Sequence, residues 1–127
     1  MPAPEKPILV IDDELDTRTY LVTLLKDNGY TVVEAANGAE GLEKVKAEAP
    51  ALVTLDMSMP EKSGVAVYRT IKEDKQLKQI PVIIITGVSR EFEQFISSRK
   101  QVPPPEGYIA KPVEAEPFIA KVRELLG

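Results

Sequence analysis

Five short apolar runs recur along the chain, and longer amphipathic segments separate them. The runs are rich in β-branched residues, which is typical of strands that are buried on both faces of a parallel sheet. They cover residues 8–11, 31–35, 52–56, 80–86 and 107–110. Pro81 falls at the start of the fourth run, where a strand tolerates proline. The pattern predicts five buried strands.

The segments between the runs place apolar residues three or four positions apart, which is the spacing of one face of a helix. Four helices are predicted around the following positions: Leu15, Arg18, Leu21, Leu24 and Leu25; Leu42 and Val45; Val67, Tyr68 and Ile71; Phe118, Ile119, Val122, Leu125 and Leu126. A shorter helix is expected around Phe92, Phe95 and Ile96. Asn28-Gly29 and Asn37-Gly38 supply turn residues that end the first helix and begin the second.

Alternating strands and helices predict an α/β fold, a doubly wound five-stranded parallel sheet with five helices on its two faces. Right-handed crossovers favour the flavodoxin-like strand order 2-1-3-4-5. The chain has 127 residues, enough for one domain with a core but too few for two. We therefore expect residues 1–127 to form a single domain, with residues 1–6 as a flexible N-terminal segment.

The composition narrows the chemistry. The chain has no cysteine and no histidine, which excludes thiol catalysis, disulfides, thiolate metal sites and a histidine general base. Its formal net charge of −4 argues against direct nucleic-acid binding, which requires clustered lysine and arginine. Neither a signal peptide nor an apolar run of membrane-spanning length is present. We expect a cytoplasmic protein that does not insert into a membrane.

Polar residues follow four of the five predicted strands. Asp12 and Asp13 end the first strand, Asp56 the third, Thr86 the fourth and Lys111 the fifth. The carboxyl ends of parallel strands share one edge of the sheet, and strands one and three are neighbours in the predicted order. The three carboxylates should therefore crowd together and raise one another's pKa unless a cation lies among them. With only oxygen ligands available, we expect Mg²⁺, with Mn²⁺ as the alternative.

Each of these residues also has a purely structural interpretation. Asp12 or Asp13 could cap the following helix, Thr86 could simply end a strand, and Lys111 could be a solvated surface charge. The combination is more informative than its members. An acid pair, a further acid, a hydroxyl and a lysine at one edge of the sheet indicate a site for a phosphoryl group beside a metal ion.

The sequence resembles a receiver domain of bacterial two-component response regulators, and is similar to the stand-alone chemotaxis regulator of that family. The matching motifs cover essentially the whole chain, in order: Ile8-Leu9-Val10-Ile11-Asp12-Asp13-Glu14, Asn28-Gly29-Tyr30, Leu55-Asp56 with Met59-Pro60 and Gly64, Ile85-Thr86-Gly87, and Lys111-Pro112.

The resemblance implies a role for each site residue. Asp56 matches the phosphoacceptor, whose carboxylate attacks the phosphohistidine of a sensor kinase. Asp12 and Asp13 match the metal-binding pair, which Asp56 and the backbone carbonyl of Ser58 complete. Lys111 matches the lysine that pairs with the acceptor and then with the phosphoryl oxygens.

The resemblance also implies how a signal leaves the site. Thr86 matches a switch hydroxyl that moves onto the phosphoryl group, and Tyr108 matches an aromatic residue that swings inward with it. The Lys111-Pro112 bond matches a cis peptide. The implied partners are a sensor histidine kinase or phosphotransfer protein and an unknown downstream target, with a homodimer through the fourth helix, fifth strand and fifth helix as a further option. Whether the chain is a stand-alone receiver or part of a longer regulator stays open.

Three features depart from the family pattern. Glu61-Lys62-Ser63 stands between Met59-Pro60 and Gly64, where an acid is common. Val88 stands where alanine is common, and we expect it to slow the loss of phosphate. Pro103-Pro104-Pro105 lengthens the segment before the fifth strand, either as a benign insertion or as an altered partner surface.

Two other functions fit parts of the pattern. A haloacid-dehalogenase-like phosphatase also uses an aspartate nucleophile with Mg²⁺, but that family generally has a second aspartate at the position of Ser58. A pseudo-receiver that binds proteins without phosphorylation would not require the complete set of site residues. The phosphorylatable switch is the preferred hypothesis.

Overall fold

The computed structural model describes residues 6–56, 63–86 and 106–126. These ranges contain five strands and four helices. The strands are β1 (Ile8–Ile11), β2 (Val32–Ala35), β3 (Leu52–Asp56), β4 (Val82–Thr86) and β5 (Gly107–Ala110). The helices are α1 (Leu15–Asp27), α2 (Gly38–Glu48), α3 (Ser63–Glu73) and α5 (Ala115–Leu126).

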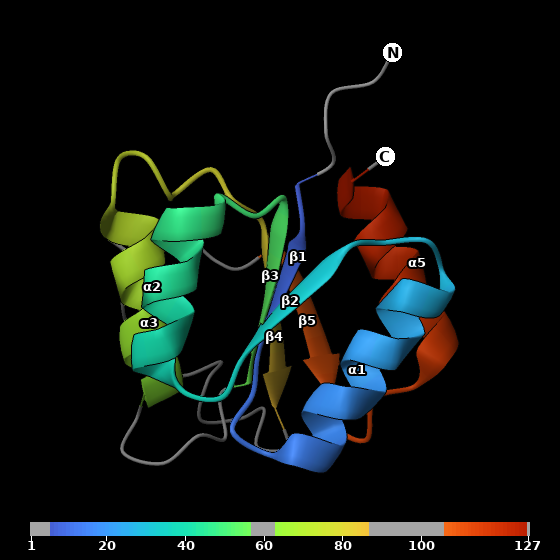
Figure 1. Ribbon diagram of the computed structural model, residues 1–127. Coiled ribbons are helices and arrows are strands. Elements are labelled where there is room, and N and C mark those ends of the chain that lie inside the picture. Colours follow the sequence, from blue (N-terminus) through green and yellow to red (C-terminus); the bar gives the residue numbers. More distant parts are fainter. Residues whose placement is uncertain (1–5, 57–62, 87–105, 127) are drawn as a thin grey trace.

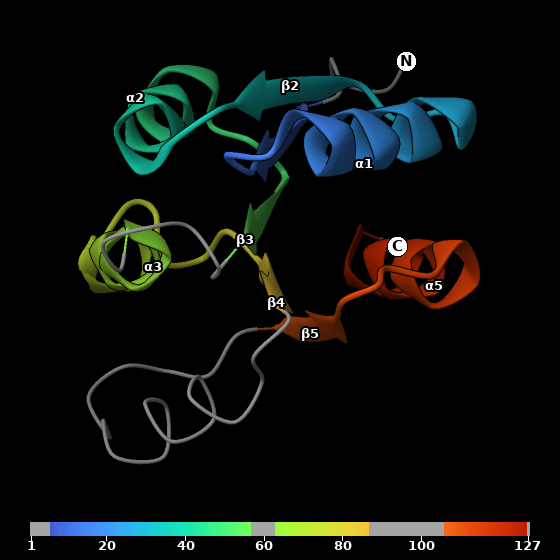
Figure 2. The same ribbon diagram turned by 90° about the horizontal axis from the view of Figure 1, so that it is seen from below.

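The strands form one parallel sheet in the order β2-β1-β3-β4-β5, which confirms the predicted topology. Helices α1 and α5 cover one face of the sheet, and α2 and α3 cover the other (Figures 1 and 2). The direction of winding changes between β1 and β3, where doubly wound sheets place their ligands. The topology therefore brings the ends of β1 and β3 side by side.

The strands are apolar throughout because helices cover both of their sides. Alternate residues of β1 point to opposite layers, so that Leu9 and Ile11 pack towards α2 and α3 while Ile8 and Val10 pack towards α1 and α5. Tyr68 and Phe118 are the largest fully buried side chains, one in each layer. The core thus holds the carboxyl ends of the strands in fixed register.

Local sequence explains how two helices adjoin the sheet. The side chain of Asn37 caps α2 by accepting a hydrogen bond from the Glu40 N–H at 2.8 Å, and Glu40 Oε1 accepts one from the Ala36 N–H at 2.8 Å. A Cβ atom at Gly41 would lie 2.6 Å from Ile11 Cδ1, so glycine permits the close approach of α2 to β1. At the end of α1, Gly29 has a φ of 90° that favours glycine.

The structure corrects several details of the prediction. β2 begins at Val32 and β4 at Val82, one and two residues later than predicted, and Pro81 precedes β4 because it has no N–H to donate. Leu15, expected on the inward face of α1, is 62% exposed. The short helix predicted around residues 92–96 and residues 1–5 of the expected flexible segment lie outside the described residues.

Candidate functional site

Three carboxylates meet at the carboxyl edge of the sheet, as predicted. Asp12 directly follows β1, Asp13 follows it, and Asp56 ends the neighbouring β3, with Ile11 paired to Leu55. One oxygen atom from each of the three carboxylates lies within 4.8 Å of the others. Asp12 and Asp56 are buried, whereas Asp13 is exposed. The cluster is closed on the protein side and open to solvent at Asp13.

Hydrogen bonds hold residues 12–14, which we call the acid turn, in place. The Asp12 N–H donates to the Ala35 carbonyl at 3.1 Å, which extends the pairing of β1 with β2 by one residue. Asp12 Oδ1 accepts a hydrogen bond from the Glu14 N–H at 2.9 Å. The expectation that Asp12 or Asp13 caps α1 is wrong. Glu14 is the N-cap residue and its side chain makes no capping bond, and the carboxylate of Asp12 accepts from the N–H of Glu14 itself.

The electrostatics of Asp12 reflect its position. The pKa of Asp12 is raised from 3.8 to about 6, mainly by burial and less by the nearby carboxylate of Asp56, against the opposing effects of the Glu14 N–H and of Lys111. The sequence predicted that the three carboxylates would raise one another's pKa. For Asp12 the structure makes desolvation the larger cause, because the core encloses this residue.

Lys111 reaches the acid cluster from the far side of β4. Its backbone N–H donates to the Thr86 carbonyl at 2.9 Å, which ties the residue after β5 to the end of β4. Its Nζ lies 3.3 Å from Asp56 Oδ1. The Lys111-Pro112 peptide is cis, as the resemblance implied. The lysine side chain is 25% exposed, so one side of the ammonium group faces solvent.

Thr86 and Tyr108 lie on adjacent strands and on one face of the sheet. Thr86 is the last residue of β4 and is buried, and Tyr108 of β5 pairs with Ile84, two residues earlier in β4. Tyr108 packs against the core layer beneath α2 and α3. Ser58, Gly87, Val88 and residues 103–105, which the sequence analysis also singled out, lie outside the described residues.

Comparison with known proteins identifies the family. Residues 8–123 match the response regulator receiver domain. The chain belongs to the response regulator receiver family. It is 31% identical over 124 residues to the polar-differentiation response regulator DivK of Brucella anthropi, covering 98% of each chain. This places the chain among two-component signalling proteins rather than substrate-turnover enzymes, and sets aside the phosphatase alternative.

Solved receiver structures show the same fold. The chemotaxis protein CheY4 of Vibrio cholerae is 25% identical with a TM-score of 0.83, over 97% of this chain and 100% of that one. A CheY-like receiver domain protein from Methanospirillum hungatei is 27% identical with a TM-score of 0.83, over 97% and 94% of the two chains.

In the described ranges, none of the receiver's helices has the length and apolar character needed to span a membrane.

The donor set of this receiver suits a hard divalent cation. Three carboxylates offer oxygen ligands at one point, which is the chemistry that Mg²⁺ and Mn²⁺ favour. Asp12 Oδ2 is buried and accepts no hydrogen bond from the described residues. A cation would satisfy that oxygen and offset the charge of the buried acids. These residues therefore fit a metal site of the kind that receivers contain.

One residue near the acid cluster escaped the sequence analysis. Arg18 appeared there only as part of the helical repeat of α1, yet its guanidinium contacts the backbone of Asp12. The available signal was chemical, because a charged residue on the inward-facing repeat of an amphipathic helix needs a polar partner. The partner itself becomes apparent only once α1 is placed against the sheet.

Proposed function

We propose that this receiver is a phosphorylatable signalling switch that accepts a phosphoryl group on Asp56. The supporting observation is the arrangement around Asp56, with Lys111 Nζ 3.3 Å from its carboxylate and the oxygens of Asp12 and Asp13 within the same 4.8 Å cluster. Burial keeps water away from the nucleophile, and the open side at Asp13 leaves access for a donor. The implied donor is the phosphohistidine of a sensor kinase or phosphotransfer protein.

The chemistry needs positioning and charge neutralisation more than a strong base. A carboxylate oxygen of Asp56 forms a bond to phosphorus as the bond to the donor's imidazole nitrogen breaks, and the imidazole leaves with its electron pair. A bound Mg²⁺ supplies positive charge beside the transferred oxygens. Asp12, Asp13, Asp56 and the Ser58 carbonyl are its proposed ligands. Lys111 offers a further positive charge, with its Nζ 3.3 Å from Asp56 Oδ1, so the absence of histidine from this chain is no obstacle.

The output follows from groups next to the acceptor. The Thr86 hydroxyl is proposed to move onto the phosphoryl group, and Tyr108, on the same sheet face, to move inward with it. The common sheet face and the adjacent strands support this coupling. β5 and α5 would then present the change to a downstream partner, or to a second copy of the chain through the fourth helix, β5 and α5.

Phosphorylation by a small-molecule donor tests the proposal directly. Wild-type protein is incubated with acetyl phosphate and Mg²⁺, and intact mass is then measured. We expect an adduct of one phosphoryl group that is absent from Asp56→Asn and that requires the divalent cation. Circular dichroism should show that Asp56→Asn remains folded, since the amide is nearly isosteric with the carboxylate.

Two outcomes would reject the proposal. An adduct that persists in Asp56→Asn would place the modification elsewhere in the chain. The absence of any adduct on the wild type, from both acetyl phosphate and a phosphorylated histidine kinase, would favour the pseudo-receiver, which binds partners without phosphorylation.

A further inference from the structure

Arg18 joins three elements at the acid edge of the sheet. From α1, its NH1 donates to the backbone carbonyl of Asp12 at 2.8 Å, and its Nε donates to Glu34 Oε1 of β2 at 2.9 Å. The Arg18 side chain is only 14% exposed, while that of Glu34 is 48% exposed. The guanidinium thus lies inside the fold with two partners in different directions.

The carbonyl of Asp12 belongs to the peptide group that links Asp12 to Asp13. β1 ends at Ile11, so the ladder of the sheet no longer fixes that peptide plane. The carboxylate of Asp12 is already held by the Glu14 N–H. Asp13 is exposed, and the orientation of the peptide before it determines where its side chain starts. The bond from Arg18 is therefore the contact that fixes this peptide plane from the side of α1.

Glu34 holds the guanidinium in the orientation that this contact requires. Its position on β2 is itself secured, because Val10 of β1 pairs with Glu34 and the Lys44 ammonium of α2 donates to the Glu34 carbonyl. A guanidinium presents several N–H groups in a rigid plane, whereas a lysine ammonium is a point charge on a flexible stem. Only an arginine can reach both the Asp12 carbonyl and Glu34 with fixed geometry.

We propose that Arg18 is a positioning residue for the metal site, which sets Asp13 relative to Asp12 and Asp56 by holding the peptide between the two acids. The inference rests on the proposed function, because it assumes that these acids bind a divalent cation. It assigns Arg18 no contact with the cation and Glu34 the task of orienting Arg18. Preorganised ligands bind a metal more tightly than ligands that binding must first order.

Mn²⁺ binding measures this role without any phosphoryl transfer. The electron paramagnetic resonance signal of free Mn²⁺ is followed as protein is added, for wild type, Arg18→Lys, Arg18→Gln and Glu34→Gln. We expect the two Arg18 variants to bind Mn²⁺ roughly tenfold more weakly, the lower end of the range for residues that orient metal ligands. Glu34→Gln should show a smaller loss in the same direction, and Mg²⁺ should compete in every case.

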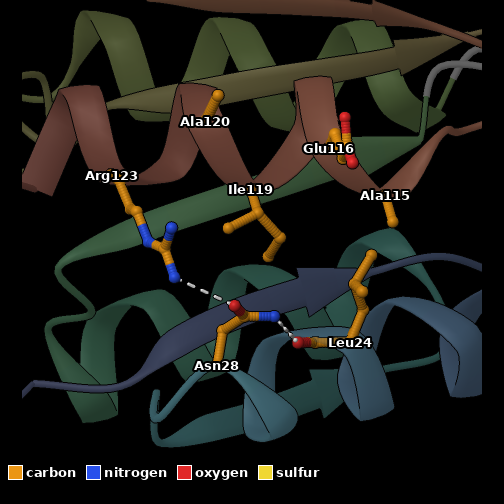
Figure 3. Close-up of a pocket in the computed structure, with 7 residues that line it drawn as sticks. All are labelled: Leu24, Asn28, Ala115, Glu116, Ile119, Ala120 and Arg123. Atoms are coloured by element: carbon orange, nitrogen blue, oxygen red, sulfur yellow. Dashed lines mark hydrogen bonds between the residues drawn. The ribbon is translucent and has the colours of Figure 1, made fainter.

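Arg123→Lys is the matched control. Arg123 of α5 donates through NH2 to Asn28 Oδ1 at 3.0 Å, at the far end of α1 (Figure 3). It also links α1 to a neighbouring element, but none of the residues around it belongs to the acid cluster. Arg123→Lys should therefore bind Mn²⁺ like wild type. Thermal unfolding of the metal-free variants reports any general loosening of α1.

The outcomes separate the possibilities. Weaker Mn²⁺ binding in Arg18→Lys than in Arg123→Lys, at similar thermal stability, supports the inference. Binding by Arg18→Lys equal to wild type would overturn it, because a point charge would then suffice. Glu34→Gln changes an exposed side chain and so retains the fold as a second variant; equal binding there would overturn the orienting role of Glu34.

Failure of the inference is distinguishable from failure of the proposed function. If wild type binds Mn²⁺, Asp12→Asn abolishes that binding and Arg18→Lys leaves it unchanged, only the role of Arg18 is wrong. If wild type binds no Mn²⁺, or Asp12→Asn binds it equally well, the proposed metal site itself is wrong and the role of Arg18 falls with it.

Discussion

Two lysine–carboxylate pairs stand at opposite edges of the sheet and are built differently. At the amino edge, Lys72 Nζ lies 2.9 Å from both oxygens of Glu106 and also donates to the Ile80 carbonyl at 3.1 Å. Glu106 in turn accepts a hydrogen bond from the Val82 N–H at 2.8 Å. At the carboxyl edge, Lys111 Nζ lies 3.3 Å from a single oxygen of Asp56.

The two lysines differ in burial and in their hydrogen-bond partners, and this indicates a difference in purpose. The Lys72 side chain is 1% exposed and its hydrogens have partners, so the pair connects α3 to the beginnings of β4 and β5. Lys111 is 25% exposed and its contact with Asp56 is longer, so of the two lysines it is the one placed to contact a further anion. A buried lysine with several partners holds the fold together, whereas a partly exposed lysine at the acid cluster is available for chemistry.

Removing each lysine should separate these purposes, with the largest effect at Lys72. Lys72→Ala leaves Glu106 and the carbonyls of Lys78 and Ile80 without their cation. We expect a loss of about 2–4 kcal/mol in the free energy of unfolding, below the full value for a buried pair because Glu106 is partly exposed. Lys111→Ala should cost less, because its ammonium is partly exposed and its contact with Asp56 is longer. Urea unfolding of both variants measures the contrast.

The double variant Lys72→Met with Glu106→Gln provides the control for that experiment. It removes both charges and should recover part of the loss, because no uncompensated carboxylate remains at the amino edge. Equal losses in the free energy of unfolding for Lys72→Ala and Lys111→Ala would show that the burial and partners of the lysine do not distinguish the two edges.

The carboxyl edge should also show a pH dependence of its own. Asp12 has a pKa of about 6 in the fold against an ordinary value of 3.8, so the metal-free fold binds a proton more tightly than the unfolded chain. The contribution of Asp12 to stability is then most favourable below about pH 4 and falls by about 2–3 kcal/mol as pH rises towards 6. The measurement is urea unfolding in EDTA between pH 4 and pH 7.

Asp12→Asn isolates that contribution from the other titrating groups. Relative to Asp12→Asn, the wild type should lose stability as pH rises from about 4 to about 6, and the difference should then stay level. Added Mg²⁺ should restore stability at pH 7 to wild type but not to Asp12→Asn. A pH-independent difference between the two proteins would contradict the raised pKa of Asp12.

The two edges also differ in how far the sequence predicts them. The site residues of the carboxyl edge end strands or directly follow them, and strand order alone brings them together. The amino-edge pair joins the last turn of α3 to Glu106, 34 residues later, and neither residue stands out from ordinary surface charges in the sequence. Long-range pairing of this kind depends on packing rather than on local pattern.

The residues around Asp12 also show what the sequence alone leaves undecided. The sequence places Asp12 after β1, but the choice between helix cap and site residue depends on the rotation of one carboxylate towards Glu14. Likewise, the repeat of α1 predicts Leu15 and Arg18 on the inward face, yet Leu15 is exposed. The repeat gives the helix, and only its contacts with β1 and β2 show which of its residues touch the site.

Thr54, which lies in β3 between the two edges, should give a smaller change in the free energy of unfolding when it is replaced. It lies in β3 two residues before Asp56, is 1% exposed, and its Oγ1 has no hydrogen-bond partner among the described residues. Its neighbours in register are Val10 and Ile83. Thr54→Val should therefore raise the free energy of unfolding by about 1 kcal/mol, because an unsatisfied buried hydroxyl is replaced by a methyl group.

Phosphorylation of Thr54→Val separates stability from function. We expect its adduct with acetyl phosphate to form as in wild type, since the hydroxyl of Thr54 has no part in the proposed chemistry. The matched variant is Thr86→Val, which removes the proposed switch hydroxyl from the other buried strand threonine. Loss of stability in Thr54→Val would indicate that its hydroxyl has a partner after all.

The smallest expected effect on the free energy of unfolding concerns residues 111–113, which follow β5 and carry Lys111. We call them the lysine loop. The Tyr20 hydroxyl of α1 donates to the carbonyl of Val113, two residues after Lys111, at 3.2 Å. Tyr20→Phe should lower the free energy of unfolding by only about 0.5 kcal/mol, because this bond is long and exposed. The Lys111 N–H also retains its 2.9 Å bond to Thr86, so the loop keeps an anchor. A loss above about 2 kcal/mol in urea unfolding would exceed a typical net hydrogen-bond contribution. It would mean that the carboxyl edge is held as firmly as the amino edge, and that Lys111 is less free to change partner than its partial exposure indicates.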